Sequence, residues 1–471
     1  MDRHFPSAPD ESPDQSAGTP GSARCPGPSV QEIVRGDLIP PPAVLRFEES
    51  RFLGDEDVGY DRYFRPDIFD AEVEKIWKRT WQFVCREEHI PRPGDHYVYE
   101  VAWLSFIVVR QEDGSIRGFW NACLHRGTKL RPSEGCGSSP DLHCRFHGWV
   151  YGLDGALQRV PCAWDFPHVT AERFHLPEVR IETWSGFVFL NPDEQAPPLA
   201  DYMAPMAEHF ADWNLAERYV DLHMAKELPC NWKAALEAFV ESYHTLETHP
   251  QLLAGVGDAN VQYDIHSEHV TRFYAALGVN SPHLDPPLSE QELVDAMLVG
   301  DRSVLGNELV VGDGETARTV MARYLRVVLG EKYGSNLSAV SDSEIIDTIE
   351  YHLFPNMILF PGYSLPMVYR FRPLGLDPER TLFEIFFLRP LPSDGARPEP
   401  AELVTVSKAE SYAVVPGMDP ALAHVYDQDT DNLRSQQQGF RASKKRGETL
   451  GHYQEARIKH FEQVVDAYLA R

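Results

Sequence analysis

Asn121-Ala-Cys-Leu-His-Arg-Gly127 and His143-Cys-Arg-Phe-His-Gly-Trp149 are the two stretches of this sequence that decide its fold. Each contains one cysteine and, two or three positions later, one histidine. Eighteen residues separate the histidine of the first pair from the cysteine of the second. Thiolate and imidazole both bind transition metals, so two Cys/His pairs at this spacing indicate a metal site.

The mixture of ligands in each pair narrows the choice of metal. A zinc site of two Cys and two His is one interpretation, but the usual zinc finger places Cys with Cys and His with His. The present order suits a [2Fe-2S] cluster in which Cys123 and Cys144 hold one iron while His125 and His147 hold the other. Two neutral imidazoles raise the reduction potential to between roughly −150 and +300 mV, so the cluster can accept one electron from a ferredoxin-like donor. His143 is interpreted as a solvent-facing or supporting residue.

The residues around the two pairs predict β-structure. Ile107–Arg110 and Ile116–Trp120 are β-rich and are joined across Asp113-Gly114, and Trp149–Tyr151 leads into Asp154-Gly155. Asp-Gly between β-rich runs is a hairpin signal. We therefore expect a small antiparallel domain with both ligand loops at its tip.

This pattern, with Arg-Gly after the first histidine and Gly-Trp after the second, resembles the Rieske centre of a ring-hydroxylating oxygenase large (alpha) subunit. The resemblance extends from about Asp61 to Leu469. It implies an α+β chain in which an all-β Rieske [2Fe-2S] domain precedes a catalytic domain of antiparallel sheet flanked by helices, a helix-grip, START-like arrangement.

Composition sets the broad class. The chain has 471 residues and a formal net charge of −27. That length can bury two cores, and the negative charge argues against a nucleic-acid partner, which lysine and arginine would have to neutralise. The seven cysteines show no pairing pattern, and no apolar run approaches the roughly 18 residues of a membrane span. We expect a cytoplasmic protein without a membrane partner.

Four segments are expected along the chain. Residues 1–42 are rich in Pro, Ser, Gly and Asp and predict a disordered tail. Residues 43–80 are expected to be an N-terminal helical segment, 81–192 the Rieske domain, and 193–471 a catalytic domain with a mononuclear iron.

The second metal site is expected around His244 and His249. The run Trp232–Glu247 lacks Gly and Pro and has helical periodicity, which predicts a helix. Five steps at about 100° place the two histidines about 140° apart, so both can bind one metal only if the helix deforms or ends between them, and Pro250 is a plausible stop. Two imidazoles and one carboxylate would form a facial triad with open positions for non-haem Fe(II) and O₂. Two surface histidines on a helix are the alternative.

The carboxylate is sought in Tyr426-Asp-Gln-Asp-Thr-Asp-Asn-Leu433, an acidic cluster at the head of an expected helix. The family resemblance, in which the ligand precedes an Asn by three positions, selects Asp429 with Asn432. Asp427 and Asp431 are interpreted as solvated acids in the first helical turn, where the helix dipole favours them.

Glu241 and Tyr243 are assigned supporting roles. Glu241 is expected on the same helix as His244 and about 60° away, where its carboxylate can accept a hydrogen bond near the ligand. In the family the corresponding acid, usually Asp, bridges to a Rieske histidine of the neighbouring subunit, and Glu occurs in relatives that oxidise quaternary amines. An exposed helix Glu is the alternative. Tyr243 is expected beside the iron.

Between the two iron-binding segments the sequence is less informative. Helices are predicted at Ser289–Leu298, from a Ser-x-x-Glu capping box, and at Thr316–Val328, either as pocket walls or as core helices. Further strands and a closing helix are predicted at Met357–Phe360, Met367–Phe371, Thr381–Leu388 and Tyr453–Leu469.

The expected function is that of a terminal oxygenase component. It would hydroxylate an apolar, aromatic substrate with O₂, as in aromatic hydrocarbon catabolism. No Gly-x-Gly-x-x-Gly fingerprint occurs, so electrons from NAD(P)H would arrive through a separate flavin reductase or ferredoxin. The resemblance implies a homotrimer, with or without a small beta subunit. The alternatives are a monooxygenase or demethylase acting on a methoxy or quaternary-amine substrate, and a non-catalytic Rieske electron carrier with a ligand-binding domain.

Overall fold

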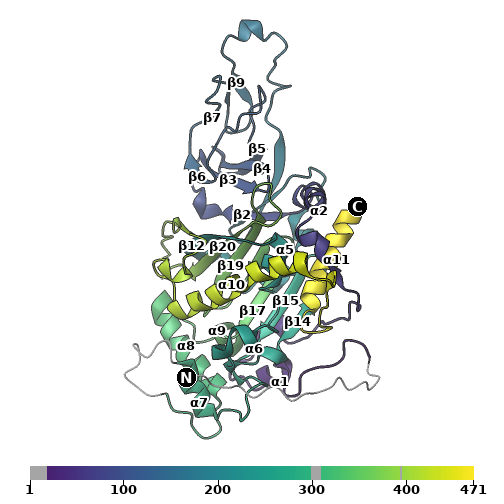
Figure 1. The fold of residues 1–471 in the computed structure, drawn as a ribbon. Helices are drawn as coiled ribbons and strands as arrows, with labels where there is room; N and C mark the ends of the chain where they lie inside the picture. Colours follow the sequence, from purple (N-terminus) through teal and green to yellow (C-terminus); the bar gives the residue numbers. More distant parts are fainter. Residues whose placement is uncertain (1–18, 299–308, 393–394) are drawn as a thin grey trace.

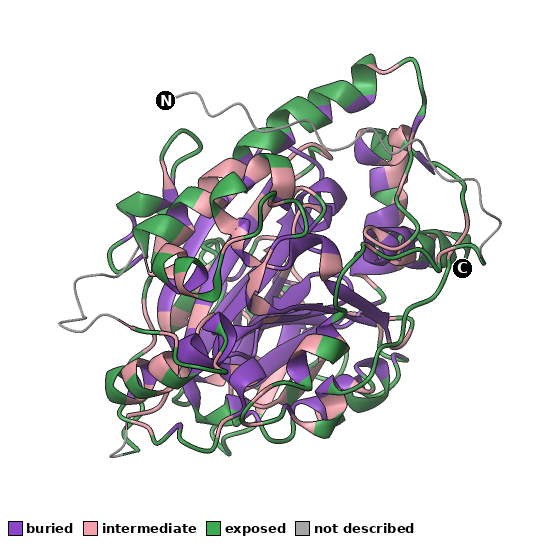
Figure 2. Cartoon of the chain, turned by 90° about the horizontal axis from the view of Figure 1, so that it is seen from below, coloured by how far each residue is buried: buried purple, intermediate pink, exposed green. Residues whose placement is uncertain are grey.

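A computed structural model describes residues 19–298, 309–392 and 395–471. Figure 1 shows a narrow β-domain standing on a broader domain in which helices surround a large sheet. Seen from below in Figure 2, the strands of that sheet are buried and many surrounding helices expose their outer faces. Among the described residues, no helix combines the length and apolar character needed to cross a bilayer.

The upper domain is built on a seven-stranded sheet in the order β2-β11-β10-β5-β4-β3-β6. Its strands are β2 (Gln82–Arg86), β3 (Asp95–Val101), β4 (Leu104–Arg110), β5 (Ile116–Trp120), β6 (Gly135–Ser138), β10 (Glu178–Trp184) and β11 (Phe187–Asn191). A second small sheet contains β7 (Leu142–His143), β8 (Val150–Tyr151) and β9 (Leu157–Arg159). The expected hairpin of β4 and β5 is confirmed. These strands lie within the span expected for the Rieske domain, whose boundaries stay a prediction.

The lower domain contains an eight-stranded sheet in the order β14-β15-β17-β18-β19-β20-β12-β21. Its strands are β12 (Arg218–Leu228), β14 (Gln262–Ile265), β15 (Val270–Ala275), β17 (Thr348–Leu353), β18 (Met357–Leu359), β19 (Met367–Pro373), β20 (Thr381–Pro390) and β21 (Leu403–Val406). Neighbouring strands pair antiparallel except β12 with β21. The strands predicted near residues 357, 367 and 381 are confirmed. Two further pairs are β1 (Val58–Gly59) with β22 (Gly447–Glu448), and β13 (Ala254–Val256) with β16 (Leu277–Asn280).

Helices cover the sheets. They are α1 (Val30–Val34), α2 (Pro66–Glu72), α3 (Leu199–Tyr202), α4 (Met206–His209), α5 (Trp232–Glu237), α6 (Thr245–Thr248), α7 (Glu290–Met297), α8 (Ala317–Tyr333), α9 (Asp342–Ile346), α10 (Pro420–Ala442) and α11 (Ala456–Ala470). The predicted helices near residues 289, 316 and 453 are confirmed in α7, α8 and α11. The expected capping box of Ser289 and Glu292 is present.

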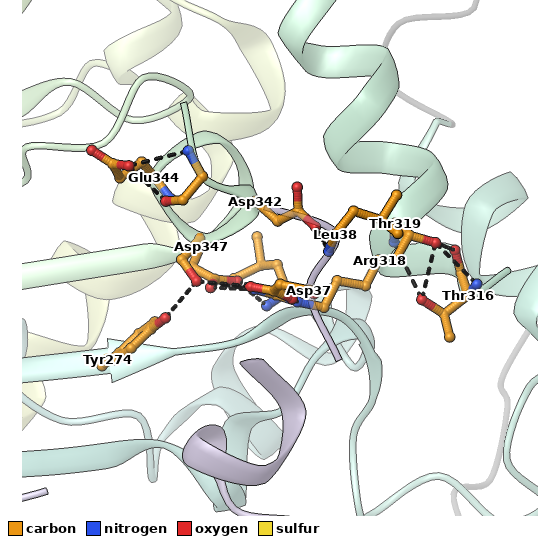
Figure 3. A network of polar contacts seen from close by, with 12 residues as sticks. Asp37, Leu38, Tyr274, Thr316, Arg318, Thr319, Asp342, Glu344 and Asp347 are labelled. Carbon is orange, nitrogen blue, oxygen red and sulfur yellow. Dashed lines mark hydrogen bonds and ion pairs between the residues drawn. The ribbon is translucent and has the colours of Figure 1, made fainter. Parts of the chain in front are cut away.

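The expected disordered tail is wrong for the part of it that the structure describes, whereas residues 1–18 lie outside the described residues. Helix α1 is capped by Ser29, and Val30 and Val34 are buried in the core. Asp37 accepts a hydrogen bond of 2.6 Å from Nε of Arg318, and Figure 3 shows this contact within a buried polar network. A few apolar and charged anchors against folded partners therefore outweigh the polar, Pro-rich composition of residues 19–42.

The two domains meet at a buried group of charged side chains. Arg370 and Arg372 lie on β19, and both bind the Glu384 carboxylate of β20 at 2.6 Å. Arg370 also donates to the Val84 carbonyl, and Arg372 to the Glu100 carbonyl, in strands of the upper domain. The large sheet therefore holds the upper domain directly.

Candidate metal centres

The two Cys/His loops at the tip of the upper domain have matching backbones. The amide of Gly127 donates to the Cys123 carbonyl at 2.9 Å, and the amide of Gly148 donates to the Cys144 carbonyl at 3.0 Å. Gly127 and Gly148 have φ of 76° and 75°, a left-handed conformation that favours glycine. Each loop therefore turns back four residues after its cysteine and presents its side chains toward the other loop.

The thiols lie inside and the imidazoles at the rim. Cys123 and Cys144 are each 2% exposed, whereas the His147 side chain is exposed. The His125 and His147 rings are 4.6 Å apart between centroids. Burial, together with the adjacent Cys144 thiol, raises the pKa of Cys123. Two thiols on one side and two imidazoles on the other fit a [2Fe-2S] cluster with one all-thiolate and one all-imidazole iron.

Two aromatic residues support these loops. Trp149 stacks on His125 at 5.1 Å with an interplanar angle of 7°. The Tyr151 hydroxyl lies 3.6 Å from Cys123 Sγ and accepts a hydrogen bond from the Leu124 amide. Sequence reasoning missed Tyr151, because a tyrosine in a strand carries no signal of such a contact. His143 is exposed, as expected of a residue outside the ligand set.

The second candidate site gathers His244, His249 and Asp429. Their ligand atoms all lie within 4.8 Å of one another. Asp429 Oδ1 is 2.6 Å from His249 Nε2 and 3.5 Å from His244 Nε2. Two imidazoles and one carboxylate that converge in this way fit a facial triad for a divalent iron.

The triad forms because the chain does not continue as one helix from Trp232 to Glu247, contrary to expectation. Helix α5 ends at Glu237, and α6 begins only at Thr245. Arg457 donates to the Val240 carbonyl at 3.2 Å, and the Ser242 amide donates to the Tyr263 hydroxyl at 3.0 Å. These external partners satisfy backbone groups that a continuous helix would have satisfied internally, so His244 and His249 can converge.

Asp429 lies in the middle of a helix rather than at its head, because α10 begins at Pro420 with Asp419 as its cap. The interpretation of Asp427 and Asp431 as first-turn acids is therefore wrong. Asp427 accepts hydrogen bonds from the Ser411 hydroxyl and the Tyr412 amide. Asp431 is exposed. Helical periodicity thus turns only Asp429 of the three toward the histidines.

Each histidine of the triad has a partner on its other ring nitrogen. Glu241 Oε1 is 2.5 Å from His244 Nδ1, and Gln428 Oε1 is 3.0 Å from His249 Nδ1. Burial lowers the pKa of His244, but the carboxylates of Asp429 and Glu241 raise it, and the net result is a pKa of about 10. Without metal the site therefore holds a proton that metal binding must displace. Sequence reasoning missed Gln428, whose only signal was its position next to Asp429.

One supporting assignment is corrected and the other stays a prediction. Glu241 contacts His244 as expected, but it lies in the segment between α5 and α6 and not on the same helix. Tyr243 is 64% exposed and is absent from the described residues that line the cavity at the triad, and its position beside the iron stays a prediction.

A cavity of about 620 Å³ opens beside the triad. His244, Asp429 and Glu241 line it, together with the further carboxylates Glu237, Glu448 and Glu455. No lysine or arginine is among its described lining residues. Burial raises the pKa of Glu237, Glu448 and Glu455, so these carboxyl groups keep a proton more readily than exposed ones. Helices α7 and α8 contribute nothing to this lining and pack against each other instead.

An aromatic cluster lies on the interior side of the same segment. Phe239 packs on Phe383 and Tyr369, with ring centroids 4.9 and 5.5 Å apart. The hydroxyl of Tyr369 is 2.6 Å from that of Tyr426, which lies one turn before Asp429 on α10. Phe239 and Tyr426, which lie close in sequence to His244 and Asp429, thus belong to an aromatic cluster.

Comparisons with known proteins give both domains a family match. Residues 80–170 match the model of the Rieske [2Fe-2S] domain, and residues 207–471 match that of the ring hydroxylating alpha subunit, catalytic domain. The chain is 32% identical over 222 residues to a chlorobenzene dioxygenase subunit alpha from Cupriavidus, covering 45% of this chain and 49% of that protein. It is 28% identical over 238 residues to a carnitine monooxygenase oxygenase subunit from Acinetobacter pittii, covering 49% and 62%. The matched segment thus spans roughly half the length of these relatives.

Solved structures share the fold. A quaternary ammonium Rieske monooxygenase in complex with L-carnitine superposes with a TM-score of 0.61 at 18% identity, over 88% of this chain and 95% of the other. Naphthalene 1,2-dioxygenase with indole bound gives 0.60 at 22% identity, over 86% and 90%.

The position of Asp429 gives a first testable prediction. Asp429→Ala should lower the affinity of the mononuclear site for Fe(II) by more than about 100-fold, because one of three ligands is lost. Loss of a residue that only hydrogen-bonds to a ligand lowers metal affinity by at most about 100-fold. Asp431→Ala is the matched control on the same helix and should keep its iron. Iron content after dialysis measures both. An Asp429→Ala variant that keeps as much iron as the control would show that Asp429 is not a ligand.

The separation of the two ligand sets gives a second prediction. Cys123→Ser or His147→Ala should abolish the optical and EPR signals of the cluster, because each removes one of its four ligands. The mononuclear site should still load iron, because its ligands lie in the other domain. A Rieske EPR spectrum that is unchanged in either variant would overturn the assignment.

Proposed function

Since the chain belongs to the ring-hydroxylating oxygenase alpha subunits, we propose that it is the terminal oxygenase of a Rieske system. It would hydroxylate an apolar, aromatic substrate with O₂ and with electrons from NAD(P)H. A flavin reductase or ferredoxin would deliver those electrons. A cytoplasmic location and a role in aromatic hydrocarbon catabolism belong to the same proposal.

The convergence of His244, His249 and Asp429 carries this proposal. A pure electron carrier would not require a second ligand set, so the triad argues against the non-catalytic alternative. When loaded, the cluster would supply single electrons and the mononuclear iron would activate O₂. The protein's own part is to hold three ligands on one side of the iron and to leave the remaining positions open. The similarity to a chlorobenzene dioxygenase subunit alpha favours an arene as substrate.

A second candidate is a monooxygenase or demethylase that acts on a quaternary amine or a methoxy compound. Glu241 favours it, because the family usually has Asp at this position and Glu occurs in oxidisers of quaternary amines. The similarity to a carnitine monooxygenase oxygenase subunit also favours this second candidate.

We propose a head-to-tail homotrimer as the working assembly, with or without a small beta subunit. Figure 1 places the tip that carries the Cys/His loops far from α6, which His244 and His249 flank, and from α10, which carries Asp429. The Cys/His loops expose Arg126 and Arg145, whereas the cavity at the triad is lined by carboxyl groups. Complementary groups on the two ends of one chain favour contact between copies, and a heterologous contact gives a ring when its rotation closes.

The choice of substrate is the third prediction. The oxygenase, reconstituted with reductase and ferredoxin, should consume arenes together with O₂ and form a diol or a phenol. Substrate loss and oxygen uptake are measured over a panel of arenes, methoxyarenes and quaternary amines. Turnover of the amines alone would establish the second candidate. Reduction of the cluster without any O₂ uptake would leave only the electron carrier.

Transfer between subunits is the fourth prediction. Glu241→Gln should keep both metals, because Glu241 is not itself a ligand, but should slow reoxidation of the cluster by substrate and O₂ by about 10- to 100-fold. The amide keeps one acceptor and loses the charge that strengthens a hydrogen bond to imidazole. Stopped-flow absorbance of the cluster measures the rate.

Mixed oligomers test the same model. A Cys123→Ser chain and an Asp429→Ala chain should each be inactive alone and should regain partial activity together, because an intact cluster can then face an intact iron across an interface. An active monomer, or verified mixed trimers without activity, would refute transfer between subunits.

A further inference from the structure

We propose that Gln428 is a positioning residue that selects which nitrogen of His249 faces the metal. The inference rests on the proposed mononuclear site. Two consecutive residues of α10 contact the two ring nitrogens of this histidine. Gln428 Oε1 lies 3.0 Å from Nδ1, and Asp429 Oδ1 lies 2.6 Å from Nε2.

The geometry of the helix makes this contact a fixed one. Successive residues of an α-helix project about 100° apart, so Gln428 and Asp429 can reach opposite edges of one imidazole. Helix α10 is continuous from Pro420 to Ala442, and His249 is 3% exposed. The ring is therefore held between two side chains of a single rigid element, and it cannot rotate without breaking a hydrogen bond.

A third residue orients the amide. Gln251 Nε2 donates to Gln428 Oε1 at 2.7 Å, so the same oxygen accepts from both Gln251 and His249. Gln251 follows His249 by two residues, within the 3₁₀ turn Pro250–Leu252. An amide nitrogen in that place would face the Nε2 donor of Gln251, so the oxygen is the atom that points at Nδ1.

The tautomer of His249 follows from this orientation. A neutral imidazole has one N–H donor and one lone pair. Asp429 Oδ1, 2.6 Å from Nε2, also accepts, so both ring nitrogens donate while no metal is bound. Because Oε1 can only accept, the hydrogen stays on Nδ1 when a metal replaces the one on Nε2, and Nε2 then provides the lone pair. Gln428 thus does for His249 what Glu241 does for His244, but with a neutral group in place of a charged one.

The neutral partner also limits the charge at the site. Asp429 and Glu241 already place two carboxylates at the triad, and Glu237, Glu448 and Glu455 line the adjoining cavity. An amide at position 428 orients His249 without a further negative charge.

The fifth prediction uses Co(II) alone as the probe of the metal-depleted protein. Gln428→Leu should weaken Co(II) binding at the mononuclear site by about 10- to 100-fold, the range for losing an outer hydrogen-bond partner, and should change the visible spectrum of bound Co(II). Gln428→Glu keeps an acceptor at the same place and should restore most of the affinity. Gln251→Leu, which removes only the contact between the amides, should have a smaller effect.

Controls separate this inference from the site itself. Gln438→Leu changes an exposed glutamine of the same helix and should bind Co(II) like the wild type. An unchanged melting temperature and cluster EPR signal show that a variant is folded, and Gln428→Met replaces the Leu variant if it is not. If Asp429→Ala weakens binding and the folded Gln428 variants do not, Gln428 has no positioning role. If Asp429→Ala also has no effect, the mononuclear site is itself wrong.

Discussion

One buried carboxylate between two guanidinium groups connects the domains of this chain. Burial raises the pKa of Glu384, but the positive charges of Arg370 and Arg372 hold it well below its usual range. Loss of one partner from such a group costs about 3–5 kcal/mol, because a buried charge is left without compensation. Both arginines also donate hydrogen bonds to backbone carbonyls of the upper domain. The Arg370–Glu384–Arg372 group therefore attaches the large sheet to the domain with the Cys/His loops. The tip that carries the Cys/His loops therefore keeps a set direction relative to the triad of its own chain.

Within this frame, the proposed ligands of the mononuclear site and Gln428 lie on one regular and one irregular element. Asp429 and Gln428 belong to a long helix, whereas His244 and His249 flank a single helical turn. The irregular segment keeps its shape because Arg457 and Tyr263, which come from other parts of the domain, satisfy its backbone. The positions of the two histidines thus depend on contacts with residues distant in sequence. The kinds of side chain at the site are set by the local sequence.

The differences between expectation and structure share a physical cause. Residues 19–42 have the composition of a disordered tail, yet Val30, Val34 and Asp37 find partners in the folded domain. The run from Trp232 has helical periodicity throughout, yet tertiary hydrogen bonds end the helix early. In both cases local propensity is a weak term that a few long-range contacts outweigh.

The sequence by itself determined the chemistry of this protein. Two Cys/His pairs admit few metals, and a His pair followed by a distant acidic cluster suggests a triad, because ligand type is a property of the side chain and not of its surroundings. The β-rich runs around the first site also determined the class of the upper domain. Tertiary structure alone decided how these residues are used. It placed Asp429 toward the histidines, bound Asp427 to Ser411, and brought Gln428 to His249, because those outcomes depend on where α10 begins and on what it packs against.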